Sequence, residues 1–556
     1  MFVPEALRQI EEELLAPGGM FETVPGEVLG ERMNVFKNRA RSLRDFVVAS
    51  ERLGQAEHLV FSDGVTERRF TFAEHACLVA RMASVLSKRY GVGPGDRVAI
   101  LAANCPEWII TFWATISLGA VAVGLNAWWT GPEISFGLED AAPKLLVVDE
   151  KRRSRLEGAP VLATLVIEDE LGPLLRNSRD APFPSTAIDE DDPAIILYTS
   201  GTTGRPKGAV HSHRNVIALV GLGFFNGARI RATRPPSPHP PCVFVTSPLF
   251  HVSGLHNAAV SCLAGGVKTV WLRGRFDAAV ALGLIEKERA TGWAYTATLL
   301  HRAVHHPGAE RYDVSSLSQL GGGGSPISRA LQSRAREVFK SAAQTLGVGY
   351  GLTECTSLAT INAGEELFHF PDSVGRPMPT VEIEIRDESG EPRVDGEQGE
   401  IYVRGPLVML GYWRNAAATA EVILPGRWLR TGDVGRIVDG RLYLSSRRSD
   451  LILRGGENIY PAEIEQRLEL HPDVAEAAVI GVDHPELGQE VKAIVVPKLG
   501  RAIDVKSLAS WAEGALAYFK VPSHWEIRAE PLPRNATGKV LKHVLREHGA
   551  STFIDE

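Results

Sequence analysis

Apolar positions in the first 190 residues alternate between two patterns. Segments with helical spacing, such as 70–90 and 106–118, are separated by short continuous apolar runs at 96–101, 120–126 and 144–149. Continuous apolar runs of this length are typical of strands buried on both faces of a sheet. Strands that alternate with helices predict parallel α/β sheets for this part of the chain.

The pattern changes after about residue 372. Apolar and polar positions then alternate with period two at 381–386, 399–404 and 441–444, which predicts a small, mainly antiparallel barrel or sheet. A polar junction at 445–450 follows. The remaining residues read as strands mixed with helices and predict a separate α+β unit.

Length and charge narrow the range of functions. The chain has 556 residues, and single cores stop growing near about 250–300 residues, so at least two domains are expected. With 60 basic and 67 acidic residues, the net charge of −7 gives no general attraction for nucleic acid. The five cysteines lie far apart without zinc-binding spacing, which predicts reduced thiols in a cytoplasmic protein.

One uncharged stretch, 108–132, is long enough to be weighed as a membrane span. A spanning helix needs about 20 predominantly apolar residues, and Gly119 interrupts this one. A buried helix followed by a buried strand explains the stretch, so no membrane span is expected. Residues 1–15 have the pattern of an amphipathic helix and not of a secretory signal.

The strongest chemical signal is the segment 198–208, YTSGTTGRPKG, which follows a short apolar run. Its glycines let the backbone wrap closely around a ligand, and its hydroxyls and Lys207 supply donors for a polyphosphate. It is not a Walker A loop, because Pro206 and Gly208 stand where that motif needs glycine and a hydroxyl residue.

This segment resembles the phosphate-binding signature of the adenylate-forming superfamily, which includes acyl-CoA synthetases, peptide-synthetase adenylation domains and firefly-type luciferases. Further motifs follow in the family's order, and the resemblance covers roughly residues 59–541. It implies an α/β fold with a large N-terminal domain, 1–446, of two α/β subdomains plus a small β-barrel. A small mobile α+β C-terminal domain, 447–556, would carry the catalytic lysine.

The resemblance also implies a set of nucleotide-binding residues. Glu354 offers a hard oxygen ligand for Mg²⁺, Tyr350 a ring to lie against adenine, and Asp433 an acceptor for the ribose hydroxyls. The residues expected to bind ATP or AMP are Thr199, Ser200, Gly201, Thr202, Thr203, Gly204, Lys207, Gly324, Ser325, Gly349, Tyr350, Gly351, Thr353, Asp433, Arg447 and Lys539. The residues expected to act in catalysis are Lys207, Thr353, Glu354 and Lys539.

Two half-reactions follow from the resemblance. A carboxylate attacks the α-phosphorus of ATP, giving an acyl-adenylate and pyrophosphate, with Lys539 bridging the carboxylate and the α-phosphate. A thiolate then displaces AMP through a channel expected at Gly455, Gly456 and Glu457. Because one cavity cannot present both the lysine and the channel, the C-terminal domain should rotate at a hinge. That hinge is expected at Ser449, where the family usually has a charged residue.

The acyl pocket is expected to involve two further motifs. By resemblance, it is lined by His251, Gly254, Gly322, Gly323 and Gly351. The segment 321–326, GGGGSP, carries two more glycines than the family pattern. These either make room for a bulky or ring-containing acid or simply loosen the backbone, and the sequence leaves both interpretations open.

The sequence therefore predicts an AMP-forming acid–CoA ligase that acts on a hydrophobic or bulky carboxylic acid with ATP, Mg²⁺ and coenzyme A. The alternatives are an adenylating enzyme that delivers its acyl group to a carrier-protein thiol or an amine, or an enzyme competent in one half-reaction. A non-catalytic nucleotide-binding relative is disfavoured because Lys207, Glu354, Asp433 and Lys539 are all present. The expected partners are small molecules, with a homodimer left open and neither nucleic acid nor membrane span expected.

Overall fold

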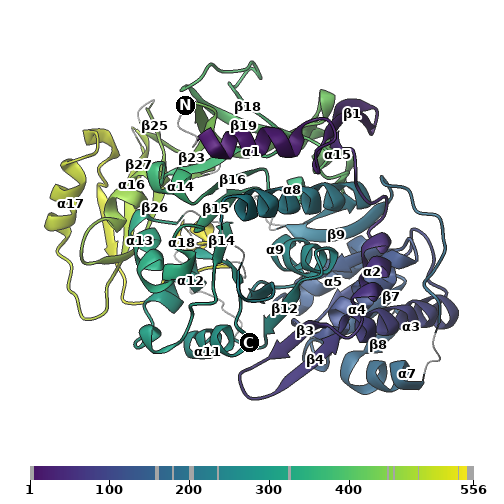
Figure 1. Cartoon of the computed structure of the whole chain (residues 1–556). Helices are drawn as coiled ribbons and strands as arrows, with labels where there is room; N and C mark the ends of the chain where they lie inside the picture. Colours follow the sequence, from purple (N-terminus) through teal and green to yellow (C-terminus); the bar gives the residue numbers. More distant parts are fainter. Residues whose placement is uncertain are drawn as a thin grey trace.

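The computed structural model describes most of the chain. The described residues are 5–156, 162–177, 181–199, 206–234, 237–323, 327–447, 450–454, 457–485, 487–535 and 538–546. Figure 1 shows a large body built on two sheets, with a smaller C-terminal part, containing α16 and α17, at one side of it.

The first sheet has seven strands, and its parallel part comes from the first 200 residues, as the sequence predicts. In sheet order the strands are β20 (Gly411–Tyr412), β10 (Lys207–Ser212), β9 (Pro193–Thr199), β6 (Val121–Gly124), β5 (Arg97–Leu101), β7 (Leu145–Val148) and β8 (Thr164–Val166). Strand β10 runs antiparallel to β9 and β20. The hairpin between β9 and β10 thus contains the predicted phosphate loop.

Helices cover this sheet and bury its core. They are α2 (Arg44–Ser50), α3 (Phe72–Tyr90), α4 (Pro106–Ser117), α5 (Gly131–Ala141), α6 (Glu150–Arg153) and α7 (Gly172–Asn177), the last preceded by the π-helix η2 (Ile167–Leu171). Every residue of α4 is buried, and strand β6 follows it, so the uncharged stretch is a core helix and a core strand. Among the described residues, no helix combines the length and apolar character that a membrane crossing requires.

The second sheet joins a parallel part to an antiparallel part. Its parallel pairings involve β3 (Glu57–Ser62), β12 (Lys268–Leu272), β11 (Cys242–Val245), β13 (Gly292–Tyr295), β14 (Gln319–Gly323) and β15 (Gly347–Tyr350). Strand β4 (Glu67–Thr71) pairs antiparallel with β3 at one edge. The helices of this part are α8 (His213–Ala232), α9 (Val252–Gly254), η3 (Leu255–Val260), α10 (Ser261–Ala264), α11 (Ala278–Glu288), α12 (Ala297–Val304), α13 (Arg329–Val338) and α14 (Glu365–His369).

The antiparallel strands predicted after residue 372 are confirmed. They are β17 (Ser373–Pro377), β18 (Glu382–Arg386), β19 (Gln398–Arg404), β21 (Ile423–Leu424), β22 (Trp428–Val438) and β23 (Arg441–Arg447), with helix α15 (Ala416–Val422) among them. One further strand, β16 (Thr360–Ala363), precedes them and pairs antiparallel with β15 and β17. They continue the second sheet, and their closure into a barrel stays a prediction. Strand β23 extends one residue beyond the predicted domain end at 446, and that boundary also stays a prediction.

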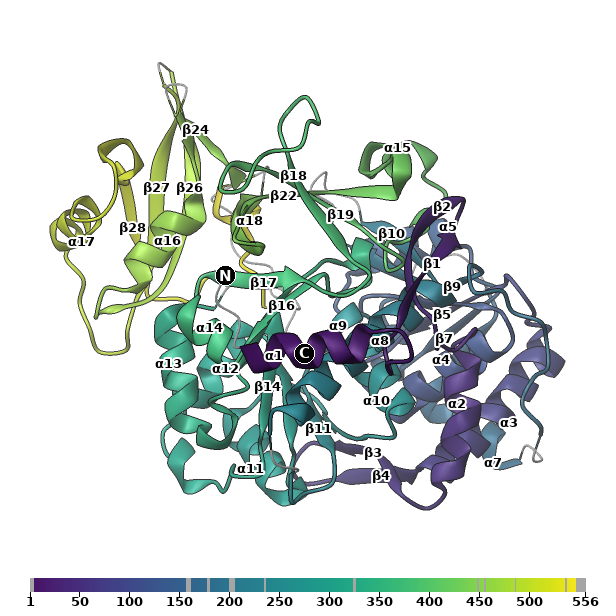
Figure 2. The ribbon, with the colours of Figure 1, turned by 45° about the horizontal axis from the view of Figure 1, so that its top comes forward.

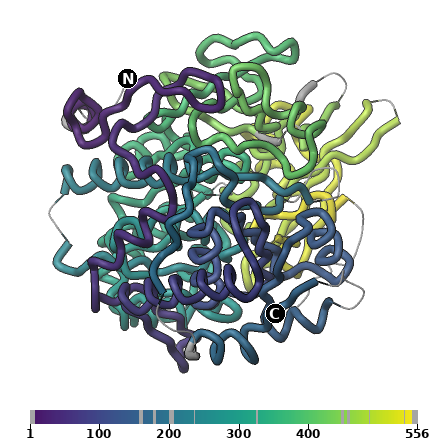
Figure 3. Tube along the Cα trace, turned by 90° about the vertical axis from the view of Figure 1, so that its right-hand side faces the viewer, coloured from purple at the N-terminus to yellow at the C-terminus, as the bar shows by residue number. Residues whose placement is uncertain are grey.

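The N-terminal segment lies on the outside of this body, where Figure 3 traces it in purple. Helix α1 (Glu5–Leu15) confirms the predicted amphipathic helix over its described residues, and strands β1 (Thr23–Val28) and β2 (Glu31–Phe36) form a hairpin after it. Glu11 of α1 pairs with Arg229 of α8 at 2.7 Å. This contact and the packing of Leu14 and Leu15 hold the helix to the large domain.

The C-terminal part has a core of its own, as predicted for an α+β unit. Its sheet contains β25 (Glu457–Ile459), β24 (Ile452–Arg454), β27 (Gly488–Pro497), β26 (Val474–His484) and β28 (His524–Ile527). Its helices are α16 (Pro461–Glu469), α17 (Val505–Glu513) and α18 (Lys542–Arg546). Helix α16 contacts strand β23 of the large domain, and Figures 1 and 2 show the C-terminal part at one side of that domain.

A carboxyl group at the end of α16 lies in an unusual environment. Burial, and secondarily the charge of Glu465, raises the pKa of Glu469 to about 7. The backbone N–H of Ala477 and the charge of Arg534 oppose this rise, whereas Glu476 adds to it. Glu469 is therefore expected to hold a proton in the folded protein under mildly acidic conditions.

We expect Glu469→Gln to stabilise the protein at pH 8 and to have little effect at pH 4.5. The unfolded chain loses this proton near pH 4.5, but the folded chain keeps it to about pH 7. The contribution of Glu469 to the free energy of unfolding therefore falls as the pH rises from about 4.5 to about 7, and it stays lost above pH 7. Urea unfolding of both forms at several pH values measures the effect, with the exposed Glu513→Gln as control. An equal stability difference at every pH would contradict the assignment.

Candidate active site

The site is built around strand β10, which begins at Lys207. Thr199 and Lys207 are paired across the β9–β10 hairpin, and the Thr199 hydroxyl donates to the Lys207 carbonyl at 3.4 Å. The Lys207 ammonium lies 5.2 Å from the ring centroid of Tyr412. The register of the hairpin thus places the lysine at the mouth of the predicted phosphate loop.

A tight turn carries the predicted metal ligand, Glu354. The short helix η6 (Thr353–Cys355) follows β15 and is followed by Thr356 and Ser357, which have φ of 59° and 120°. The chain comes so close to itself here that a Cβ on Gly351 would lie 1.9 Å from the Ser357 carbonyl oxygen. Gly351 is therefore required by the shape of this turn.

Two elements hold the turn from outside. His211 of β10 donates from Nε2 to the Thr353 carbonyl at 2.7 Å, and the Met409 N–H donates to the Glu354 carbonyl at 2.9 Å. Burial lowers the pKa of His211 to about 4, so the ring is neutral at physiological pH and donates from a single nitrogen. The backbone on both sides of the Glu354 side chain is consequently fixed.

The Glu354 carboxylate fits a magnesium ligand. The Tyr412 hydroxyl donates to its Oε1 at 2.8 Å, and no basic side chain among the described residues pairs with it. The described residues also contain no group of three or more His, Cys, Asp or Glu side chains that could hold a metal. Because Mg²⁺ is commonly bound by one or two carboxylates together with substrate phosphates and water, a single carboxylate of this kind is sufficient.

The predicted nucleoside-binding residues meet on neighbouring strands. Tyr350 of β15 is buried, and its hydroxyl donates to Asp433 Oδ2 of β22 at 2.9 Å. Burial, and then the Asp433 charge, raises the pKa of Tyr350 well above its usual value, so the phenol stays protonated. The β22–β23 register sets Arg447 opposite Asp433. Three residues predicted from separate motifs are thus adjacent, and their contacts to adenine and ribose stay predictions.

The loop before Lys539 docks on the large domain. Thr298 of α12 donates to the Gly538 carbonyl at 3.2 Å, and Arg534 donates to the same oxygen at 2.7 Å. The Lys539 N–H donates to Asn535 Oδ1 at 2.8 Å, which closes the loop on itself. The backbone next to Lys539 is therefore tied to α12 of the large domain through Gly538. A role of Lys539 in the first half-reaction stays a prediction.

Replacing Thr298 with valine should slow adenylate formation by about 2- to 10-fold and leave acyl transfer from supplied acyl-adenylate unchanged. Valine keeps the shape but removes the donor to Gly538, and a single hydrogen bond contributes roughly 0.5–1.5 kcal/mol. Pyrophosphate release and thioester formation are assayed separately. Thr233→Val, at the distant end of α8, is the matched control. If Thr298→Val slows adenylate formation and acyl transfer equally, the contact between Thr298 and Gly538 is not specific to the domain arrangement of the first half-reaction.

The proposed acyl-pocket motif forms a helix start. His251 precedes α9 and accepts from the Ser253 N–H at 3.3 Å, and burial lowers its pKa to about 4. A Cβ on Gly254 would lie 2.2 Å from the Pro248 carbonyl oxygen. The glycine is therefore explained by packing, and its contact with an acyl group stays a prediction.

Gly322 and Gly323 of β14 have packing partners, whereas a Cβ on Gly321, the first of the two additional glycines, would meet no atom within 4 Å. A Cβ on Gly322 would come within 2.2 Å of the Tyr295 ring, and one on Gly323 within 2.9 Å of the Gly349 carbonyl oxygen. The Tyr295 hydroxyl donates to the Gly347 carbonyl at 2.9 Å, which fixes that ring. Neighbouring strands thus occupy the space beside these two glycines. Their place in the acyl pocket stays a prediction.

Several predicted residues lie outside the described part of the chain. They are Ser200, Gly201, Thr202, Thr203, Gly204, Gly324, Ser325, Ser449, Gly455 and Gly456, together with the side chains of Arg447 and Glu457.

Three residues of the site were missed by sequence reasoning: His211, Thr298 and Tyr412. A signal existed for His211, because residues 207, 209 and 211 share one face of a strand. Tyr412 and Thr298 act through contacts with residues far away in the chain. No spacing rule within the sequence points to such contacts.

Comparison with known proteins agrees with this geometry. Residues 46–413 match the model of the AMP-binding enzyme family, and residues 463–539 match that of the AMP-binding enzyme C-terminal domain. A feruloyl-CoA synthase from Amycolatopsis sp is 36% identical over 482 residues, covering 86% of this chain and 93% of that protein. A long-chain-fatty-acid–CoA ligase from Mycobacterium tuberculosis is 33% identical over 526 residues, covering 93% and 99%.

A solved structure extends the likeness to three dimensions. The o-succinylbenzoate CoA synthetase from Bacillus subtilis, in complex with its acyl-adenylate intermediate, has a TM-score of 0.78 and is 29% identical. The match covers 93% of this chain and 100% of that one, so both domains are included. The chain therefore belongs to the AMP-binding, or adenylate-forming, enzyme family, in its acyl-CoA ligase branch.

Proposed function

We propose that this protein activates a hydrophobic or bulky carboxylic acid with ATP and transfers the acyl group to coenzyme A, releasing AMP and pyrophosphate. The observation that carries the proposal is that Lys207 and Glu354 both contact the same residue, Tyr412. A cation for phosphate and a carboxylate for a metal thereby lie together, as nucleotidyl transfer requires.

The first half-reaction is attack of the substrate carboxylate on the α-phosphorus of ATP. The new bond joins a carboxylate oxygen to phosphorus, and the bond to pyrophosphate breaks with its electron pair leaving on pyrophosphate. Lys207 and Lys539 supply positive charge to the phosphates and to the carboxylate. Bound Mg²⁺, held by Glu354, would neutralise further phosphate charge. The bond from Thr298 to Gly538 keeps the Lys539 loop at the large domain during this step.

The second half-reaction is attack of the CoA thiolate on the acyl carbon, with AMP as the leaving group. We place the CoA channel at Gly455, Gly456 and Glu457 and the hinge at Ser449. Rotation there would withdraw the Lys539 loop from Thr298 and bring the channel residues to the acyl-adenylate. A proline at Ser449, which fixes φ, would block this motion.

The acid is a bulky or hydrophobic one in this proposal. Relatives named for ferulate, indoleacetate and long-chain fatty acids support this class. The neutral His251 at the proposed pocket adds no charge that would favour a second carboxylate. We place the reaction in the cytoplasm, and the wide separation of the five cysteines along the chain supports a reducing compartment. Light scattering in solution would distinguish a monomer from a homodimer.

The experiment that tests the function is a panel of acids with and without CoA. Ferulate, indoleacetate, o-succinylbenzoate and palmitate are each incubated with ATP and Mg²⁺, and pyrophosphate, AMP and acyl-CoA are quantified. We expect at least one bulky acid to give AMP and acyl-CoA in equal amounts. If adenylate forms without acyl-CoA, and the acyl group passes to an amine or a carrier-protein thiol, that nucleophile and not CoA is the acceptor. No pyrophosphate release with any acid would overturn the proposal.

A further inference from the structure

Tyr412 touches both of the charged groups that handle ATP in the proposed reaction. Its hydroxyl donates to Glu354 Oε1 at 2.8 Å, and its ring lies 5.2 Å from the Lys207 ammonium. Among the described residues, no carboxylate forms an ion pair with Lys207. Tyr412 is therefore a direct link between the predicted phosphate lysine and the predicted metal ligand.

The main chain around Tyr412 is held firmly. Strand β20 pairs Tyr412 with Ala209 of β10. On either side, the Trp413 N–H donates to Gly208 at 2.7 Å and the Leu410 N–H to Val210 at 2.8 Å. A tyrosine on this backbone has little freedom to move away from β10.

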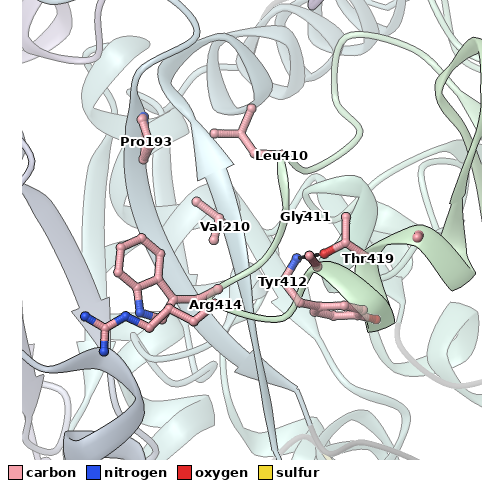
Figure 4. Close-up of a pocket in the computed structure, with 10 residues that line it drawn as sticks. Pro193, Val210, Leu410, Gly411, Tyr412, Arg414 and Thr419 are labelled. Carbon is pink, nitrogen blue, oxygen red and sulfur yellow. Dashed lines mark hydrogen bonds between the residues drawn. The ribbon is translucent and has the colours of Figure 1, made fainter.

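The side of this segment turned away from Glu354 is also packed. The Tyr412 N–H donates to the Thr419 hydroxyl of α15 at 2.9 Å. Figure 4 shows Tyr412 and Thr419 together beside Val210 of β10, at a shallow depression of about 380 Å³. Helix α15 thus fixes the backbone of Tyr412 through the hydroxyl of Thr419.

The same segment fixes the backbone of the glutamate. The Met409 N–H donates to the Glu354 carbonyl at 2.9 Å, while Tyr412 holds the carboxylate. With Oε1 accepting from the tyrosine, Oε2 has no hydrogen-bond partner among the described residues and is available to a metal. The ring face attracts the Lys207 ammonium without neutralising it, so the charge stays available for phosphate.

We propose that Tyr412 is a positioning residue that orients Glu354 for Mg²⁺ and Lys207 for the phosphates of ATP, and so sets the metal requirement of adenylate formation. The inference rests on the proposed function, because it assigns Mg²⁺–ATP to this site. Groups that orient metal ligands typically change metal affinity about 10- to 100-fold when they are removed. The effect should be confined to the half-reaction in which polyphosphate is present.

The test compares Tyr412→Phe with the wild type in metal binding and in catalysis. Mn²⁺ binding is followed by electron paramagnetic resonance in the presence of a non-hydrolysable ATP analogue, so no turnover is needed. Phenylalanine keeps the ring beside Lys207 and removes only the donor to Glu354. We expect the Kd for Mn²⁺ and the Mg²⁺ concentration for half-maximal pyrophosphate release to rise about 10-fold. Thioester formation from supplied acyl-adenylate should not change.

A second variant and a control separate positioning from folding. Tyr412→Leu also removes the ring, so it should weaken binding of the ATP analogue itself in addition to the metal. Tyr443→Phe, on the antiparallel strand β23, is the matched control and should leave Mn²⁺ binding as in the wild type. Melting temperatures show whether each variant is folded.

Three results would decide the matter. An unchanged Kd for Mn²⁺ in Tyr412→Phe, or equal loss of both half-reactions with a lowered melting temperature, would overturn the proposal. A third result separates the two claims. If Tyr412→Phe binds Mn²⁺ more weakly than the wild type, but the wild type adenylates no acid, Tyr412 remains a metal-positioning residue and the proposed function is overturned. The two claims can therefore fail separately.

Discussion

Replacing Lys539 with alanine is expected to slow adenylate formation by about 10²- to 10³-fold and to leave acyl transfer from supplied acyl-adenylate nearly intact. The lysine meets charge that develops between carboxylate and phosphate only in the first step, and removing one such group typically has this effect. The structure places its loop against the large domain through Gly538 and Thr298. The lysine thus follows directly on a contact with the large domain, which fits its predicted role in that step.

Both half-reactions are measured on the same preparation. Pyrophosphate release reports the first, and thioester formation from synthetic acyl-adenylate and CoA reports the second. Lys506→Ala, an exposed lysine on α17 of the same domain, controls for loss of surface charge. If Lys539→Ala lowers both rates equally, the two steps do not use different arrangements of the domain.

Gly351→Ala is expected to cost adenylate formation roughly 10²-fold and to lower the melting temperature. The new Cβ would lie 1.9 Å from the Ser357 carbonyl oxygen and 2.5 Å from its carbon, so the backbone of the turn must shift. That turn carries Glu354, and a misplacement of about 1 Å in a catalytic arrangement can cost about 10²-fold in rate. The loss should thus come from the geometry of the carboxylate.

A helical glycine provides the matched control. Gly223 of α8 has no atom within 4 Å of an added Cβ. Alanine there should leave activity unchanged and stabilise the helix slightly, because alanine has the higher helix propensity. Pyrophosphate release and thermal melting are measured for both variants. Wild-type activity in Gly351→Ala would mean that the turn can relax without moving Glu354.

Candidate residues within a continuous motif could be named from the sequence. Lys207 stands in a segment whose glycines and hydroxyls predict phosphate binding, and Glu354 stands in a segment that resembles a family motif. Their roles stay predictions. The parallel strands were predictable as well, because burial on both faces requires continuous apolar runs such as that of β7. The buried helix α4 was separable from a membrane span by the glycine that ends it.

Residues that act across the fold were not predictable in this way. Tyr412 reaches Glu354 only because β20 pairs with β10, and that pairing joins segments separated by most of a domain. The glycines of β14 illustrate the same limit. Their composition is visible in the sequence, but the Tyr295 ring that fills the space beside Gly322 comes from the neighbouring strand. The sequence left open whether these glycines make room for an acyl group or loosen the backbone, and the structure shows that a neighbouring ring fills the space beside Gly322.

The most direct test of the central claim follows an oxygen atom. A carboxylic acid accepted by the enzyme is labelled with ¹⁸O in both carboxyl oxygens and converted with ATP and CoA, and the products are analysed by mass spectrometry. Attack of the carboxylate on the α-phosphorus predicts one ¹⁸O atom in AMP, none in pyrophosphate, and acyl-CoA equal in amount to AMP. Unlabelled AMP, or label in inorganic phosphate with ADP as the co-product, would contradict the account.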